Sequence, residues 1–188
     1  MKIKILIPVY NDWQSVIKLL ENINSEVSSL SHEFSIIIVN DFSTENRPEI
    51  FLNLDNLKSI KIINMNKNHG HARCNATGLK YIFEKEEFDY VIPMDGDGED
   101  RPEEIKQILD NLSYNPDKPI VGERIKRSEG ILFKFCYFTH KLVLFTFTGE
   151  SIKYGNYTCL PKSVVEKMVN EKATWSSFSG ALAKVAKD

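Results

Sequence analysis

The chain has 188 residues, enough for one domain, and carries a formal net charge of −2. This balance gives no general attraction to nucleic acid or anionic lipid, so any recognition of phosphate must be local. The apolar fraction of 42% and the charged fraction of 27% are ordinary for a globular protein, and no uncharged apolar run of about 18 residues predicts a transmembrane helix. The three cysteines, Cys74, Cys136 and Cys159, form neither a metal spacing nor a disulfide framework, which favours a reducing, cytoplasmic compartment.

Apolar runs and polar breaks alternate along the chain. Runs rich in β-branched residues predict buried strands at residues 3–9, 34–39, 60–64, 90–94 and 120–122. Helices are predicted directly after a cap at Asn11-Asp12 and at residues 48–57, 72–85 and 102–112. This alternation indicates an α/β fold with a mainly parallel sheet, right-handed crossovers and flanking helices.

Polar clusters follow four of these strands, after Val9, Val39, Asn64 and Met94. The carboxyl ends of parallel strands meet at one edge of a sheet, and ligands bind beyond that edge. We therefore expect the four clusters to lie together and to form one ligand site.

The most informative cluster is acidic and follows the strand at 90–94. Five carboxylates occupy nine positions: Asp95, Asp97, Glu99, Asp100 and Glu103. Carboxylates this close repel one another unless a cation lies among them, and hard oxygen ligands suit Mg²⁺ or Mn²⁺ together with a substrate phosphate. The alternative is an acidic turn whose charges are solvated, since Asp-Gly pairs are common in turns.

Two polar segments have both a functional and a structural interpretation. Asp41, after the second strand, could accept hydrogen bonds from a nucleobase or ribose, or could belong to a helix cap or an Asx turn. Residues 66–73 open a helix with exposed N–H groups and basic side chains that favour an anion, or form an ordinary loop. His69 and His71 resemble a metal-binding pair, but alternate positions in a loop are weak evidence for one.

Two later segments suggest a second ligand. Arg124, Lys126 and Arg127 form a local basic cluster that fits an anionic group, with a solvated loop as the alternative. Residues 131–147 are apolar and unusually aromatic, which fits a core helix, an interfacial helix or one wall of a lipid groove.

Four motifs in the first 103 residues form a specific combination. Residues 8–12 read Pro-Val-Tyr-Asn-Asp, residues 39–45 read Val-Asn-Asp-Phe-Ser-Thr-Glu, residues 68–78 begin Asn-His-Gly, and residues 95–103 begin Asp-Gly-Asp-Gly-Glu. Together they resemble the family 2 glycosyltransferases of GT-A fold, especially the dolichyl- and polyprenyl-phosphate sugar transferases. Looser similarities lie at residues 121–124, where the family receives the acceptor phosphate, and at residues 155–162.

Three departures from the family pattern bear on the expected site. Asp12 replaces a Glu, Asn40 replaces the first Asp of its motif, and Glu99 replaces a Gln near the metal. The Asn40 change leaves recognition of base and ribose to Asp41. Chains of this branch usually continue past this length, so both a C-terminal truncation and a short member are open.

The resemblance implies a GT-A-type, Rossmann-like fold and a metal-dependent hexosyltransferase that uses Mg²⁺ or Mn²⁺. It implies one catalytic domain at 1–188, with a nucleotide-sugar-binding half at about 1–122 and an acceptor-side half at about 123–188. The implied catalytic residues are Asp95, Asp97 and Arg124, with Asp95, Asp97 and Glu99 as metal ligands. The residues implied to bind the nucleotide sugar are Pro8, Tyr10, Asn11, Asp12, Asp41, Asn68, Gly70, Arg73, Asp95 and Gly96. The acceptor phosphate is assigned to Arg124, Lys126 and Arg127.

The implied reaction moves a sugar, with inversion, from a nucleotide diphosphate sugar to a polyprenyl phosphate. Such an acceptor places the protein in the cytoplasm, with peripheral association at the cytoplasmic face of a membrane, and no nucleic acid partner is expected. A glycosyltransferase that acts on a sugar hydroxyl, with Glu99 or Asp100 as base, is an alternative. A nucleotide-binding domain without activity is another. A nucleotidyltransferase or a dinucleotide-dependent dehydrogenase fits less well, because no glycine-rich loop follows the first strand.

Overall fold

The computed structural model describes residues 1–48, 54–122 and 156–186, which form a six-stranded sheet in the order β3-β2-β1-β4-β6-β5. The strands are β1 (Lys2–Val9), β2 (Glu33–Asn40), β3 (Leu57–Asn64), β4 (Tyr90–Pro93), β5 (Ile120–Val121) and β6 (Thr158–Pro161). Strands β1 to β4 are parallel, whereas β6 runs antiparallel to both β4 and β5. The predicted α/β fold with a mainly parallel sheet is confirmed.

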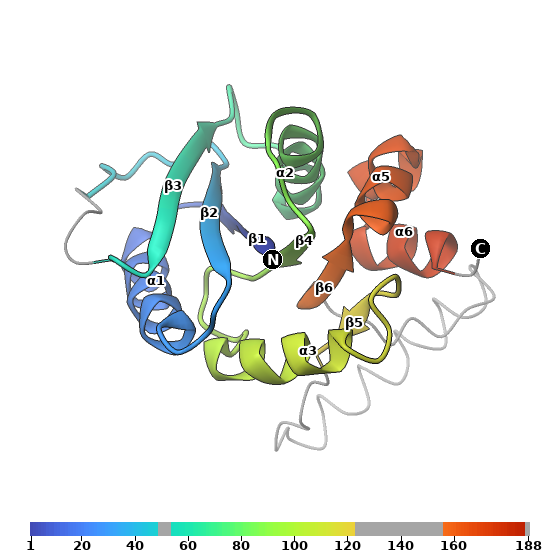
Figure 1. The fold of residues 1–188 in the computed structure, drawn as a ribbon. Coiled ribbons are helices and arrows are strands. Elements are labelled where there is room, and N and C mark those ends of the chain that lie inside the picture. The colour runs from blue at the N-terminus through green and yellow to red at the C-terminus, as the bar shows by residue number, and fades with distance from the viewer. Residues whose placement is uncertain (49–53, 123–155, 187–188) are drawn as a thin grey trace, which may run out of the picture.

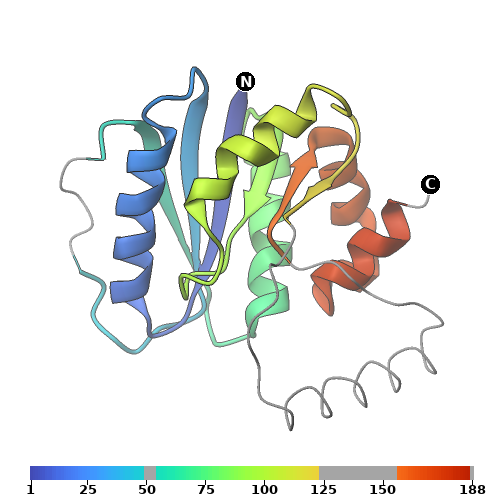
Figure 2. The ribbon, with the colours of Figure 1, turned by 90° about the horizontal axis from the view of Figure 1, so that it is seen from below.

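Helices cover both faces of the sheet (Figures 1 and 2). On one face lie α1 (Trp13–Val27) and α3 (Ile105–Leu112), which follows the 3-10 turn η1 (Pro102–Glu104). On the other face lie α2 (His71–Lys85), α5 (Lys162–Asn170) and α6 (Phe178–Val185), with the 3-10 turn η2 (Lys172–Trp175) before α6. Each face therefore has its own hydrophobic cluster.

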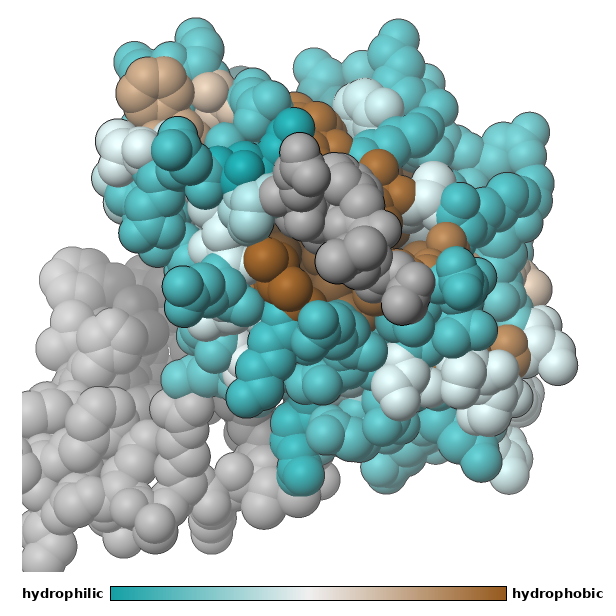
Figure 3. Space-filling model, turned by 90° about the vertical axis from the view of Figure 1, so that its left-hand side faces the viewer, coloured by the Kyte–Doolittle hydropathy of each residue, from teal (hydrophilic) through white to brown (hydrophobic). Residues whose placement is uncertain are grey.

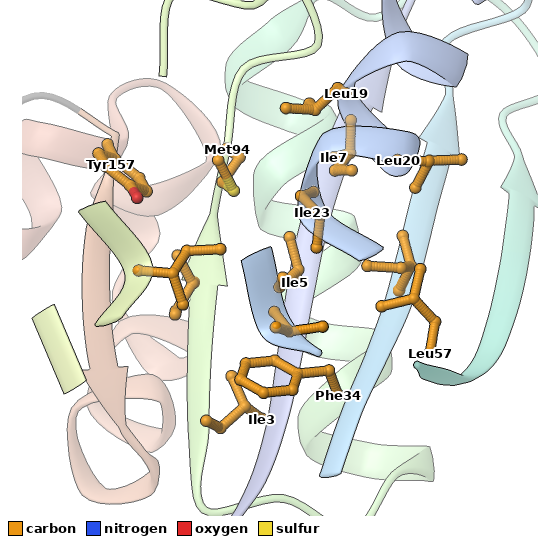
Figure 4. Packing of buried hydrophobic residues seen from close by; sticks show 14 of the residues in the cluster. Ile3, Ile5, Ile7, Leu19, Leu20, Ile23, Phe34, Leu57, Met94 and Tyr157 are labelled. Carbon is orange, nitrogen blue, oxygen red and sulfur yellow. The ribbon is translucent and has the colours of Figure 1, made fainter. Parts of the chain in front are cut away.

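The central strand β1 contributes to both clusters because its side chains alternate between the two faces. Ile3, Ile5 and Ile7 point toward α1, where Leu20 and Ile23 meet them (Figure 4), and all five are fully or almost fully buried. Burial of one such side chain contributes roughly 1.5–3 kcal/mol. A strand that is buried on both faces reads as a continuous apolar run, which is the signal in the sequence.

The opposite face depends on a close contact between Gly78 of α2 and Leu6 of β1. A Cβ atom at Gly78 would overlap the Cδ1 of Leu6 and lie 2.9 Å from its Cδ2, and Leu6 is fully buried. Alanine would gain about 1 kcal/mol in helix propensity, but overpacking costs about 1–3 kcal/mol. We therefore expect Gly78→Ala to lower the free energy of unfolding by up to about 2 kcal/mol in urea titrations.

Lys80→Ala, on the exposed face of the same helix, serves as the control and should change the free energy of unfolding by less than about 0.5 kcal/mol. A Gly78→Ala protein at least as stable as the unaltered one would show that Leu6 can move away.

Most strand and helix predictions are confirmed, with shifts at the ends. The helix predicted at 48–57 is wrong at its C-terminal end, because Leu57 begins β3 and pairs with Phe34 of β2; residues 49–53 lie outside the described residues. Leu57 is buried in the hydrophobic cluster that packs against α1. Its burial and its pairing with β2 together favour the strand conformation over a helix. Strand β6 was not predicted as a strand.

The surface seen from the side of β3 is largely hydrophilic, with apolar residues gathered near the centre of that face (Figure 3). Within the described residues, no helix has the length and apolar character needed to cross a membrane.

Candidate active site

The carboxyl ends of the four parallel strands meet at one edge of the sheet, as predicted. The backbone N–H of Asp41 donates to the carbonyl of Val9 at 2.8 Å, and the N–H of Met94 donates to the carbonyl of Leu6 at 2.9 Å. The residues that directly follow β2 and β4 are thus hydrogen-bonded through their backbone to β1.

A pocket of about 320 Å³ lies at this edge. It is lined by Pro8, Val9, Tyr10, Asp12, Val16, His71, Asp95, Gly96, Asp97 and Asn156. Six of these belong to the predicted site: Pro8, Tyr10, Asp12, Asp95, Gly96 and Asp97. Gly96 allows close packing here, because a Cβ atom would lie 3.1 Å from both the carbonyl oxygen of Pro8 and a methyl group of Val16.

The loop after β1 is held to the loop after β2 by the side chain of Asn11. Asn11 has a positive φ of 50°, and its Oδ1 accepts hydrogen bonds from the N–H groups of Thr44 at 2.7 Å and Glu45 at 3.2 Å. The helix cap is Asp12 alone, whose Oδ1 accepts from the N–H of Ser15. Asn11 therefore joins the loops after β1 and β2 rather than capping α1.

Asp41 is buried and positions the start of α2. Its two carboxylate oxygens accept hydrogen bonds from the N–H groups of His69 at 2.7 Å and Gly70 at 2.8 Å. Gly70 has a φ of 86°, a conformation that glycine adopts without strain. Burial, together with the nearby charge of Asp41, raises the pKa of the Cys74 thiol to about 12, so this thiol stays protonated. A role for Asp41 toward a nucleobase or ribose stays a prediction.

Replacement of Asp41 by asparagine should destabilise the fold by about 2 kcal/mol, because an amide nitrogen would then face a backbone N–H donor in a buried place. Thermal and urea unfolding measure the loss.

Asn40→Asp is the matched comparison on the same strand end. In the variant, one carboxylate oxygen would still accept the N–H of Ser43, as Oδ1 of Asn40 does at 3.0 Å. The Asn64 amide, which accepts from Asn40 in the unaltered chain, would rotate so that its nitrogen donates to the other carboxylate oxygen. We expect a change below about 0.5 kcal/mol. Equal effects for the two variants would contradict the role given to Asp41.

The acidic loop after β4 is ordered by its own hydrogen bonds. The N–H of Asp95 donates to the buried carboxylate of Asp100 at 2.8 Å, and the N–H of Glu99 donates to Asp97 at 2.9 Å. Downstream, the buried Tyr157 donates to the carbonyl of Arg101 at 2.8 Å, and burial raises the pKa of its hydroxyl. This loop is therefore attached to the start of β6.

Two side chains that the site prediction did not include contact Asp95. Its Oδ1 lies 2.8 Å from Nε2 of His71 and accepts from Nδ2 of Asn156 at 3.3 Å. The hydrogen bond to Asp95, opposed by burial and aided by the charges of Asp95, Asp100 and Asp97, raises the pKa of His71. The spacing of His69 and His71 suggested at most a metal pair, and Asn156 was included only in the looser family similarity at residues 155–162, without a role of its own.

The donor set fits a hard divalent cation. Asp95 and Asp97 both line the pocket and offer carboxylate oxygens, and Mg²⁺ or Mn²⁺ is commonly held by one or two carboxylates plus substrate phosphates. No three His, Cys, Asp or Glu side chains among the described residues gather closely enough to hold a metal. Glu99 is exposed outside the pocket lining, and its place as a third ligand stays a prediction.

The remaining predicted residues are not brought into the pocket. Asn68 and Arg73 are exposed near the start of α2, and Gly70 provides the N-terminal boundary of that helix. Arg124, Lys126, Arg127 and the aromatic run at 131–147 lie outside the described residues. Their roles toward an acceptor stay predictions, as does the division into halves.

The family model described as Glycosyl transferase family 2 matches residues 4–168. The chain belongs to this family. Its curated relatives include the undecaprenyl-phosphate 4-deoxy-4-formamido-L-arabinose transferase of Yersinia enterocolitica, which is 28% identical over 93% of the chain and 54% of that protein. The transferase of the same name from Proteus mirabilis is 28% identical over 85% of the chain and 47% of that protein. The chain thus spans about half the length of these curated relatives.

Solved glycosyltransferase structures share the fold. The mannosyltransferase PcManGT from Pyrobaculum calidifontis, in complex with GDP-Man and Mn²⁺, has a TM-score of 0.64 at 15% identity, covering 98% of the chain and 51% of PcManGT. S. aureus TarS 1-349 has a TM-score of 0.61 at 16% identity, covering 97% and 55%. The predicted family 2 membership and GT-A fold are confirmed.

Proposed function

We propose that this chain transfers a sugar from a nucleotide diphosphate sugar to a polyprenyl phosphate, with inversion at the sugar carbon and with Mg²⁺ or Mn²⁺. The observation that carries the proposal is the placement of Asp95 and Asp97 in one pocket with the Pro8–Asp12 loop. The Yersinia enterocolitica relative, an undecaprenyl-phosphate sugar transferase, supports a polyprenyl phosphate as acceptor. The GDP-Man and Mn²⁺ in the PcManGT complex support the donor and the ion.

Asp95 and Asp97 would hold the divalent cation, which supplies positive charge against the negative charge that develops on the leaving diphosphate. Tyr10 is half exposed at the pocket and offers a ring to the nucleoside. The N-terminus of α2, which begins at His71 without a side-chain cap, turns the positive end of its dipole toward the same edge.

The acceptor determines whether a base is needed. A sugar hydroxyl must lose a proton during attack, whereas a lipid monophosphate is already an anion at neutral pH. Asp100 is buried and accepts the backbone N–H of Asp95, which suits a structural role better than that of a base. A phosphate acceptor instead needs cations to position it, and Arg124, Lys126 and Arg127 supply them in the sequence.

The proposal is tested by incubating the chain with UDP-, GDP- and dTDP-sugars, Mn²⁺ and undecaprenyl phosphate in detergent micelles. We expect mass spectrometry to detect a lipid-linked sugar with one class of donor. Transfer to a soluble sugar acceptor in place of undecaprenyl phosphate would instead favour the hydroxyl-acceptor alternative.

A further inference from the structure

His71 directly follows the Asn-His-Gly of residues 68–70. It is the first residue of α2, and it follows Gly70 with its positive φ. Its side chain is about half exposed and lines the pocket beside Asp95 and Asp97. The imidazole therefore lies where the donor would bind.

Asp95 is held by contacts from three parts of the chain, two to its carboxylate and one to its backbone. Its Oδ1 lies 2.8 Å from Nε2 of His71 and accepts from Nδ2 of Asn156 at 3.3 Å, and its backbone N–H is bound by Asp100. These partners are 24, 61 and 5 residues away in the sequence. Hydrogen bonds of this kind set the orientation of a ligating carboxylate.

The proton in the short contact is on His71. An ionised carboxylate only accepts hydrogen bonds, so Nε2 must donate to Asp95. Both the neutral Nε2–H tautomer and the imidazolium carry this proton, so the contact does not depend on the charge of His71.

A buried side-chain amide lies close to the imidazole. Asn75, one helical turn after His71, is 1% exposed, and its Nδ2 lies 3.3 Å from Nε2 of His71. Its Oδ1 is buried and has no hydrogen-bond partner among the described residues. A turn of the Asn75 amide brings Oδ1 to the Nε2–H of His71, so Asn75 can support the same tautomer.

We infer that His71 is a positioning residue of the donor site, which holds Asp95 through Nε2–H for binding of the divalent cation, with Asn156 as a second donor to the same oxygen. This inference rests on the proposed function. It assigns no direct coordination of the cation to His71.

The test compares His71→Gln, His71→Asn and His71→Ala with the unaltered chain. The amide nitrogen of Gln can reach the position of Nε2 and keep the hydrogen bond, whereas that of Asn corresponds to Nδ1 and falls short. Mn²⁺ affinity is measured by electron paramagnetic resonance in the presence of UDP or GDP, a readout that needs no turnover.

Loss of a partner of this kind lowers metal affinity by about 10- to 100-fold, which we expect for the Ala and Asn variants, with Gln within about threefold of the unaltered chain. His69→Ala is the matched control, because the His69 imidazole contacts Asn66 and not Asp95, and it should leave the affinity unchanged. Circular dichroism establishes that each variant is folded.

Three results would overturn the inference. Unchanged Mn²⁺ affinity in His71→Ala, together with normal Mn²⁺ binding by the unaltered chain, would overturn this inference and leave the proposed function intact. Affinity as low in His71→Gln as in His71→Ala would show that a ring nitrogen is required, as expected of a direct metal ligand. No Mn²⁺ binding by the folded, unaltered chain with either nucleotide would overturn the proposed function together with this inference.

Discussion

Replacement of Asp97 by alanine is expected to lower the rate of sugar transfer by about 10²- to 10³-fold. Asp97 lines the pocket together with Asp95, and both carboxylates come from the loop after β4. Without Asp97, the leaving diphosphate would lose much of the positive charge that stabilises it. The rate is measured as release of nucleoside diphosphate in the presence of acceptor.

The same substitution should leave the fold intact, because Asp97 is exposed and accepts one local hydrogen bond from Glu99. Asp110→Ala, which removes an exposed carboxylate from α3, controls for the change in net charge and should transfer sugar at the unaltered rate. An Asp97→Ala protein that keeps more than about one tenth of the activity would contradict the role given to this carboxylate.

Replacement of Glu86 by alanine is expected to lower the free energy of unfolding by about 3–5 kcal/mol. Glu86 follows α2 and contacts Nζ of Lys4 at 3.2 Å and Nζ of Lys61 at 2.6 Å. The side chains of Lys4 and Glu86 are only 7% and 8% exposed, so alanine would leave the Lys4 charge buried without its partner. Urea unfolding at pH 7 measures this loss.

The adjacent residue provides a matched control. Glu87 pairs with Lys2, two residues before Lys4 on the same strand, but its side chain is 86% exposed. Exposed ion pairs contribute about 0–1 kcal/mol, so Glu87→Ala should be nearly neutral. Similar losses for the two variants would contradict the importance of burial at Glu86.

The contribution of Glu86 should also depend on pH. Burial opposes ionisation of Glu86, but the hydrogen bonds from Lys61 and Lys4 outweigh it and lower the pKa below its ordinary value of 4.5. A lowered pKa in the folded state gives stability that is complete above the unfolded-state pKa and is lost as the pH falls through the folded-state pKa. The stability difference between the unaltered chain and Glu86→Ala should therefore shrink below about pH 4.5.

The parts of the fold that could be predicted are those with a strong local signal. Apart from Lys4, the run from Ile3 to Val9 is apolar on both faces, and the Asp-Gly-Asp sequence follows closely after a strand. Both the buried sheet and its acidic edge therefore follow from the sequence. The convergence of the strand ends then follows from the geometry of parallel sheets.

The remaining features depend on contacts between distant residues. Leu57 belongs to a strand because it pairs with Phe34, and β6 is a strand because it pairs with both β4 and β5. Asn11 and Asp12 also have different roles because of their partners: Asn11 bonds to the loop after β2, whereas Asp12 caps α1. The neighbouring residues in the sequence do not indicate such distant partners.

The candidate site shows the same division. Asp95 and Asp97 could be predicted from their spacing, whereas His71 and Asn156 reach Asp95 from 24 and 61 residues away. The contact from His71 depends on where Asp41 fixes the start of α2, through hydrogen bonds to the N–H groups of His69 and Gly70. Sequence spacing alone does not specify that placement.

The most direct test of the central claim, that this pocket binds a nucleotide sugar together with a divalent cation, is calorimetric titration of UDP-, GDP- and dTDP-sugars into the chain with and without Mn²⁺. We expect one class of nucleotide to bind and its binding to require Mn²⁺. Absence of binding by all three classes, in a chain that circular dichroism shows to be folded, would contradict an intact donor site.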